Sequence, residues 1–454
     1  MGARITDSEL YGHLWGTDEM RAVFDERARL QTWLDILVAL AEVQAELDLI
    51  PAEAAEAIAR EAKVERLDVR FVAEETHRTG HSTLGLINGL RRILPPDAGE
   101  WVYYGVTVQD VTDTWTALAM RAVGAVAWRD LRAIEASLLD LAERHRDTVM
   151  AGRTHGQPGA PITFGFKAAV WAGEVRRHLD RLREGSPRWL VGQLAGAVGT
   201  LGFFGEAGPE LRRLFCERLG LGDPGIAWTS SRDRVAEFVS LLAMGSSTMA
   251  RIGNEVYQLQ RPEIGEVREP ASAEAVGSIT MPHKRNPEVS EHLVTLSRLI
   301  RANAAVVVEG MVAEHERDGR GWKAEWVAFP EVCLLAGAAL RFCRDMVAGL
   351  EVDAEAMRAN LGGYAASEAV LAALSPKIGK HRAQELLQDV LAEGRRMGLG
   401  IEEALTMSPA LEEHLSAEIL AGAAEPHPGS APRDVDGMVT RIREARRDES
   451  DDWP

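Results

Sequence analysis

Residues 277–287 read GSITMPHKRNP, from Gly277 through Ser278, Lys284 and Asn286 to Pro287. They end a long stretch, 261–287, that is rich in Pro, Gly, Ser and Ala and has no regular periodicity. Loops of this length inside compact proteins are usually functional or disordered. A serine on a glycine-containing loop, followed by a lysine and an amide, suits a lid that brings a hydroxyl to an anionic ligand. An ordinary surface loop is the alternative interpretation.

Helical periodicity dominates on both sides of this loop. Apolar residues recur at three- and four-residue spacing, which predicts long helices over 25–48, 110–146, 165–184, 232–260, 287–316 and 325–349. Long amphipathic helices with few strand-like alternations predict a bundle that oligomerises to bury its further apolar faces. The expected domains are a mixed helical N-terminal domain (1–105), a central long-helix bundle carrying the loop (106–350) and a small helical C-terminal domain (351–454).

Composition restricts the class of ligand. The 454 residues include 51 Lys and Arg against 69 Asp and Glu, so the formal net charge is -18. Such a balance argues against a broad nucleic-acid surface, although a few local cations can still bind a small anion. No His/Cys/Asp cluster has metal-ligand spacing and no glycine-rich phosphate loop follows a strand, so no metal and no organic cofactor is expected.

The cysteines and the N-terminal sequence indicate the cellular compartment in which the protein is expected. Cys216, Cys333 and Cys343 lie in apolar helical patterns without CxxC spacing, which predicts buried structural thiols in a reducing compartment. The sequence from Met1 lacks a basic region followed by an apolar run, and no uncharged apolar stretch of about 18 residues occurs. We therefore expect a soluble, cytoplasmic protein without membrane partners.

A second polar segment precedes the predicted helix 165–184 and reads GRTHGQP over 152–158. His155 has a side chain that transfers protons near neutral pH, and Thr154 offers a hydroxyl donor to a carboxylate. A structural histidine in a turn is the alternative.

A third segment, YYGVTVQDVTDT over 103–114, lies where the first domain is expected to join the bundle. Its threonines and aspartates are residues that cap helix N-termini. Helix N-termini also attract carboxylates, so capping and ligand binding are compatible here.

These three segments resemble signatures of the fumarase/aspartase superfamily. The loop is similar to the pattern GSSxMPxKxNP, with Ile279 in place of the second serine, and 152–158 is similar to GRTHxQ. The resemblance implies that Ser278 is the general base, that Lys284 and Asn286 bind a substrate carboxylate, and that the loop closes over the ligand. It also implies that His155 acts as general acid or in a charge relay, with Glu291 as its carboxylate partner.

The third segment resembles HYGxTSxDxxDT of the adenylosuccinate lyase and 3-carboxy-cis,cis-muconate cycloisomerase branch, with Tyr103 replacing the histidine and Val108 the serine. Substrate contacts are thereby implied for a set of residues drawn from this and the neighbouring similar stretches: Thr107, Gln109, Thr154, His81, Tyr103 and Arg317.

Fold and assembly follow from the same resemblance. It implies an all-α, three-domain fumarase/aspartase-like fold whose long central helices form the 20-helix core of a homotetramer. In the superfamily the three segments meet from three different subunits, so each active site is shared between chains. The implied ligand is a small dicarboxylate.

Trp322 and Trp326 restrict the range of possible substrates. They stand where adenylosuccinate lyases carry a serine and an arginine for the nucleotide phosphate, and an indole cannot replace an arginine against a dianion. The stretch from Gly321 instead resembles GWxAEW of the cycloisomerase, whereas Arg78-Thr79-Gly80-His81 resembles adenylosuccinate lyase. We therefore expect β-elimination from a substituted succinate to give fumarate, breaking a C–N bond with an amine or nitro leaving group, as in nitrosuccinate. The alternatives are the cycloisomerase, adenylosuccinate lyase and a catalytically silent structural protein.

Overall fold

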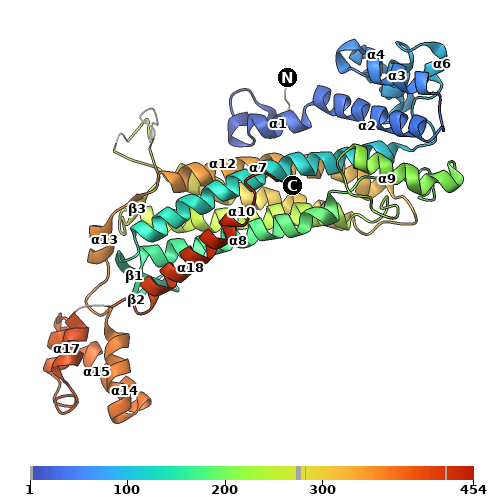
Figure 1. Cartoon of the computed structure of the whole chain (residues 1–454). Helices are drawn as coiled ribbons and strands as arrows, with labels where there is room; N and C mark the ends of the chain where they lie inside the picture. The colour runs from blue at the N-terminus through green and yellow to red at the C-terminus, as the bar shows by residue number, and fades with distance from the viewer. Residues whose placement is uncertain (1–3, 272–277, 282, 425–426, 454) are drawn as a thin grey trace.

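The computed structural model describes residues 4–271, 278–281, 283–424 and 427–453, and long helices make up most of it (Figure 1). The expected all-α fold with a central bundle is confirmed. Each bundle helix packs on at least two others, which gives the bundle one continuous apolar core. The bundle comprises α7 (Val108–Arg144), α8 (Phe164–Trp189), α10 (Asp233–Gln260), α11 (Glu288–Glu309) and α12 (Gly319–Ala348).

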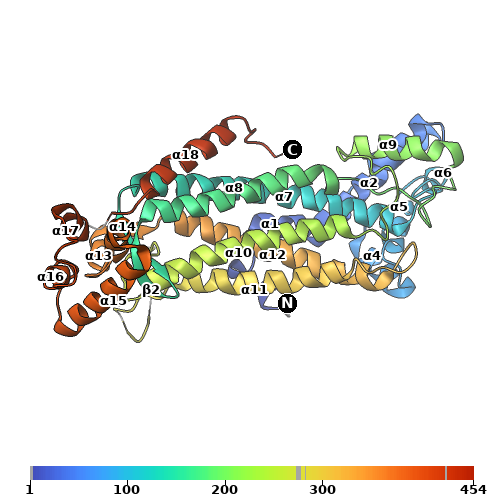
Figure 2. The same ribbon diagram turned by 90° about the horizontal axis from the view of Figure 1, so that it is seen from below.

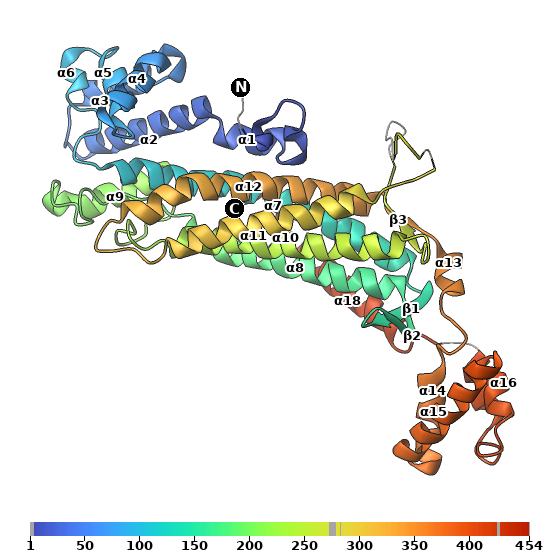
Figure 3. The ribbon, with the colours of Figure 1, turned by 180° about the vertical axis from the view of Figure 1, so that it is seen from behind.

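The N-terminal helices cover one side and one end of this bundle. Helices α1 and α2 lie along α7, while α3 to α6 cluster at the end where α7 begins (Figures 1 and 3). Helix α9 (Gly208–Arg218) packs on α2 at the same end. The N-terminal elements are α1 (Asp18–Phe24), α2 (Glu26–Glu46), α3 (Ala52–Glu61), α4 (Val69–Thr79), α5 (Leu84–Arg91) and α6 (Pro96–Gly99), with short 3-10 turns at Ile5–Asp7, Gly12–Leu14 and Val64–Arg66.

Two small antiparallel sheets interrupt the helical pattern at the opposite end. Strands β1 (Val149–Thr154) and β2 (Gln157–Thr163) form a hairpin after α7, and β3 (Val267–Arg268) pairs with β4 (Glu351–Val352). His155 and Gly156 make the hairpin turn with φ values of 53° and 74°. Two-residue hairpin turns favour positive φ because their twist then matches that of the strands.

The C-terminal region divides between two locations. Helices α14 to α17 enclose a separate core around Leu374, Leu387 and Leu405, whereas α18 returns to pack on α7 and α8 (Figure 2). Beyond α18, the buried carboxylate of Glu449 pairs with Arg176 at 2.9 Å. The helices are α13 (Ala354–Ala359), α14 (Ser367–Ile378), α15 (Lys380–Met397), α16 (Ile401–Thr406), α17 (Ala417–Ala424) and α18 (Ala431–Arg447).

Helix α12 is long and apolar enough to cross a membrane by length and composition alone. Two-thirds of its most apolar window (67%) is nevertheless buried inside the protein, against α7, α10 and α11. It is therefore a core helix. Its Cys333 and Cys343, together with Cys216 of α9, are buried free thiols. The prediction that the cysteines are buried is therefore confirmed.

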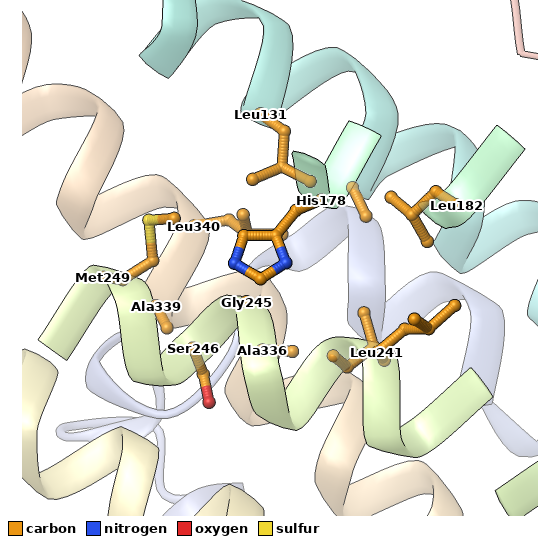
Figure 4. A pocket seen from close by; sticks show the side chains of 12 residues that line it. Leu131, His178, Leu182, Leu241, Gly245, Ser246, Met249, Ala336, Ala339 and Leu340 are labelled. Carbon is orange, nitrogen blue, oxygen red and sulfur yellow. The ribbon is translucent and has the colours of Figure 1, made fainter. Parts of the chain in front are cut away.

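One histidine is buried in the bundle core. His178 of α8 lies among leucines of α7, α10 and α12, beside a cavity of about 20 Å³ (Figure 4). Its Nε2 is hydrogen-bonded to Thr248 Oγ1 at 2.7 Å. Burial, reinforced by the positive charge of Arg181, lowers the pKa of His178 to about 4. The imidazole is therefore neutral in the native protein near pH 7.

This histidine should make the protein acid-sensitive. Between pH 6.5 and about 4 the unfolded chain binds a proton at His178 that the native state excludes, so native stability falls as the pH is lowered through this window. The loss is about 3 kcal/mol at most. Urea unfolding at pH 7 and pH 5 should show a smaller pH dependence in His178→Gln than in wild type. The exposed His381→Gln is the control, and equal pH dependence in both variants would contradict the assignment.

Candidate active site

The first group of predicted site residues lies where α7 begins. Arg317 donates from Nη2 to Thr107 Oγ1 at 3.0 Å and to the carbonyl oxygen of Ala197 at 3.2 Å. Thr107 is the N-cap of α7, in the segment where the sequence predicted a helix start capped by Thr or Asp. The arrangement places a guanidinium and a hydroxyl at a helix N-terminus, which together favour a carboxylate ligand.

Asp110 holds this group in place. Its carboxylate accepts hydrogen bonds from the backbone N–H groups of Thr107 (2.8 Å), Ala195 (2.8 Å) and Gly196 (3.1 Å). Burial raises the pKa of Asp110 to about 7, although the three amide donors act in the opposite direction. Asp110 thus ties the start of α7 to the loop whose Ala197 carbonyl receives Arg317.

Tyr103 and His81 lie at the same end of the molecule. Tyr103 has a positive φ of 63°, and the charges of Asp110 and Arg317 both act on its phenol. Burial raises the pKa of Tyr103, so the hydroxyl stays protonated and can donate. His81 accepts at Nδ1 from the backbone N–H of Leu84 at 3.2 Å, which in the neutral ring leaves the proton on Nε2.

Gln109 faces inward. Its side chain is fully buried and donates from Nε2 to Asp113 (3.2 Å) and to the carbonyl oxygen of Thr229 (3.1 Å). Asp113 in turn receives Arg232, which also binds Glu325 in a buried network. In this chain Gln109 therefore supports the packing behind Thr107, and its predicted contact with substrate stays a prediction.

The hairpin carries His155 and Thr154 at its exposed tip. Next to this tip, Arg153 donates from Nη1 to the buried carboxylate of Glu266 at 2.9 Å. Asn360 donates to the same carboxylate at 2.9 Å, so the hairpin, the chain before β3 and α13 are held together. These contacts hold the strand that precedes His155 against α13 and the segment before β3.

The loop that carries Ser278 is anchored at both ends by Glu269. This buried carboxylate accepts from the backbone N–H groups of Val289 (3.2 Å) and Ser290 (2.7 Å), which lie in the first turn of α11 after the loop. Between the anchors, Ser278 Oγ accepts from the backbone N–H of Met281 at 2.9 Å. Lys284 is exposed, Asn286 is half-buried and Glu291 is exposed in the first turn of α11. Gly277 and Pro282 of the motif lie outside the described residues.

The predicted residues therefore gather at two ends of the bundle. Tyr103, Thr107, Arg317 and His81 lie where α7 begins, whereas the hairpin and the Ser278 loop lie beyond its far end (Figures 1 and 3). Helix α7 has 37 residues, which at 1.5 Å per residue span about 55 Å. Within one chain, Ser278 and the Thr107–Arg317 pair are therefore too far apart to contact the same small substrate.

Comparison with known proteins decides the family. A family model described as a lyase matches residues 15–301. The chain belongs to the fumarase/aspartase superfamily. It is 41% identical over 444 residues to an N-acetyl-S-(2-succino)cysteine lyase of Dickeya dadantii, covering 97% of this chain and 98% of that protein. It is 36% identical over 447 residues to an adenylosuccinate lyase of Methanothermobacter thermautotrophicus, covering 97% and 98%.

The fold agrees with solved members of the superfamily. The crystal structure of 3-carboxy-cis,cis-muconate lactonizing enzyme from Pseudomonas putida matches with a TM-score of 0.89 at 32% sequence identity, covering 96% of this chain and 99% of that one. The chain is thus a superfamily lyase with relatives in several branches.

Two supporting features of this superfamily site were absent from the sequence analysis. Glu269 and the Arg153–Glu266 pair join segments that are 20 and 113 positions apart, and no local pattern announces such contacts. Asp110, by contrast, stands three positions after Thr107, the spacing of a capping box, and could have been recognised. Within the described ranges, no group of three or more His, Cys, Asp or Glu side chains is placed to hold a metal ion.

Proposed function

We propose that this superfamily lyase eliminates a thiol from an S-(2-succino) thioether and releases fumarate. Ser278 Oγ removes a proton from the succinyl methylene next to a carboxylate, the C–C double bond forms, and the C–S bond breaks. Its electron pair leaves on sulfur as a thiolate, which then takes up a proton. The negative charge that develops on the substrate carboxylate calls for preorganised donors, here Lys284, Asn286, Thr154, Thr107 and Arg317.

The relative at 41% identity, whose name specifies a succinylated cysteine, is the observation that carries the choice of sulfur. Elimination of a thiol does not require a strong general acid in the site. A free thiol has a pKa of about 8.5, so a thiolate can leave near neutral pH with little help. An amine can leave only after a proton reaches it, and His155 would have to supply that proton.

Two other reactions remain candidates on specific observations. Similarity to adenylosuccinate lyase, together with the stretch from Arg78 to His81, favours cleavage of a C–N bond, as the sequence analysis expected. Similarity to the lactonizing enzyme, with the GWxAEW-like stretch at Trp322 and Trp326, favours cycloisomerisation without fumarate. The two indoles meet edge to face with centroids 4.8 Å apart, and neither carries charge for a phosphate.

Fumarate release distinguishes these reactions. Purified protein should release fumarate from N-acetyl-S-(2-succino)cysteine with kcat/KM at least tenfold above that for an N-(2-succino) amino acid, measured by ultraviolet absorbance. The same preparation should leave 3-carboxy-cis,cis-muconate unchanged. Preferential cleavage of the nitrogen compound, or lactone formation, would replace sulfur elimination with the corresponding alternative.

The proposed lyase works as a homotetramer with sites shared between chains. The separation of Ser278 from Thr107 and Arg317 by the length of α7 supports this assembly. The bundle helices α10, α11 and α12 also expose apolar side chains that such an assembly would bury. These include Met244, Leu299, Val306 and Val327.

Mixed oligomers provide the test of sharing. Ser278→Ala and Arg317→Met should each be inactive alone, since the first lacks the base and the second lacks a carboxylate-binding cation. Mixed tetramers formed after dissociation and reassembly should regain activity, because some sites then combine an intact Ser278 with an intact Arg317. Absence of recovery in tetramers shown by mass spectrometry to be mixed would exclude sharing of these two residues.

A further inference from the structure

A cavity of about 610 Å³ lies between the N-terminal helices and the bundle. Its walls come from α2, α4, α7 and α12, and five of its side chains are aromatic. Gly80 and Ser82, the neighbours of His81, line it, as does Thr112, one helical turn beyond the start of α7. The cavity therefore adjoins the carboxylate-binding group. The aromatic residues are Trp33, Trp115, Trp322, Trp326 and Phe329.

The charged groups that line the cavity favour a ligand with hydrogen-bond acceptor atoms. Its two carboxylates, Asp113 and Glu325, are both engaged by Arg232 through hydrogen bonds of 2.6–3.1 Å. Arg29 lies 4.4 Å above the ring of Trp115, and the carboxylate whose charge acts on it is Glu26, three positions earlier on α2. The cavity is thus lined by two cations, Lys323 and Arg29, and the guanidinium of Arg29 is stacked on an aromatic face.

Two donor groups without acceptors lie just behind the same wall. The Nε of Arg29 and the Nε1 of Trp33, both on α2, are buried and have no hydrogen-bond acceptor within the part of the chain that the structure describes. Buried polar groups are nearly always paired, since an unpaired donor loses its hydration without compensation. Both groups can only donate, and both atoms are covered by neighbouring atoms of the wall, so they add polarity behind the cavity surface without facing the ligand directly.

We propose that this cavity binds the leaving-group half of the substrate, an S-linked cysteine whose nitrogen carries an apolar or aromatic acyl group larger than acetyl and whose carboxylate pairs with Arg29. The inference rests on the proposed thioether elimination and extends it to the far side of the sulfur. Pockets of about 300–1,000 Å³ hold drug-sized ligands, and 610 Å³ lies well inside that range. An acetyl group would leave most of the aromatic wall uncovered.

The acyl chain should control the efficiency of turnover. Each buried methylene contributes about 0.8 kcal/mol, which corresponds to about a fourfold gain in kcat/KM. Fumarate release from S-(2-succino)cysteine bearing N-acetyl, N-butanoyl, N-hexanoyl and N-benzoyl groups should therefore rise along the series. Trp326→Ala should flatten the rise. Tyr11→Ala, which removes an exposed aromatic ring outside the cavity, should preserve it.

The proposed contact between Arg29 and the cysteine carboxylate is tested by changing both the protein and the substrate. Arg29→Gln should lower kcat/KM at least tenfold for the N-benzoyl substrate with a free cysteine carboxylate, and less than threefold for its cysteinamide analogue. Equal losses for the two substrates would show that Arg29 does not bind that carboxylate.

The outcomes of these experiments test the cavity assignment separately from the proposed elimination reaction. Fumarate release at one kcat/KM for every acyl group leaves thioether elimination intact and overturns the cavity assignment. If no thioether is cleaved, binding is measured directly by quenching of tryptophan fluorescence with N-benzoylcysteine and N-acetylcysteine. Tighter binding of the benzoyl compound, lost in Trp326→Ala, supports the cavity without the reaction, and equal binding overturns it.

Discussion

Ser278→Ala should lower kcat by about 10²- to 10⁴-fold, the usual contribution of a positioned general base. Within the described part of the chain, the hydrogen bond of this side chain is local, from Met281 N–H to Oγ, so its removal should leave the folded core unchanged. Carboxylate binding depends on other groups and should persist. Steady-state fumarate release and thermal stabilisation by fumarate measure the two effects separately.

Thr280→Ala is the matched control, because it removes an exposed hydroxyl two positions along the same loop. It should retain activity within about threefold of wild type. Activity of Ser278→Ala within tenfold of wild type would contradict the role of Ser278 as the base. A comparable loss in Thr280→Ala would assign the effect to the conformation of the loop.

Arg232→Met should destabilise the protein by about 3–5 kcal/mol, the range expected when one partner of a buried ion pair is removed. Arg232 is 2% exposed and lies between Asp113 at 2.8 Å and Glu325 at 2.6 Å. Without it, two buried carboxylates would face each other uncompensated. Burial already raises the pKa of both Asp113 and Glu325, so moderate acidification should recover part of the loss by protonating them.

The control is Arg218→Met, which also removes an arginine paired with two carboxylates, Glu42 and Glu46. This network is solvent-exposed, so its loss should cost about 1 kcal/mol or less. Urea unfolding at pH 7 and at one protein concentration compares the two variants. Equal losses would mean that burial does not set the strength of the Arg232 network.

Local patterns accounted for the parts of the fold that depend on neighbouring residues. Apolar spacing predicted 110–146 as a helix and the structure has α7 at Val108–Arg144, because Thr107 and Asp110 cap it two residues earlier. The same spacing placed a helix at 325–349, whereas α12 begins at Gly319, where Asp318 accepts from the backbone N–H of Arg320. The capping side chain thus determines where the helix begins, and apolar periodicity alone does not predict that position.

The motif residues were likewise readable from the sequence, since Ser278, Lys284 and Asn286 share one loop, and Thr107 stands at a helix start. Their positions in space were not. Only the tertiary structure placed that loop and Thr107 at opposite ends of α7, and only it joined Arg232 to Asp113 and Glu325 across 119 and 93 positions. Helix formation is a local property of the chain, whereas such contacts depend on how long helices pack side by side.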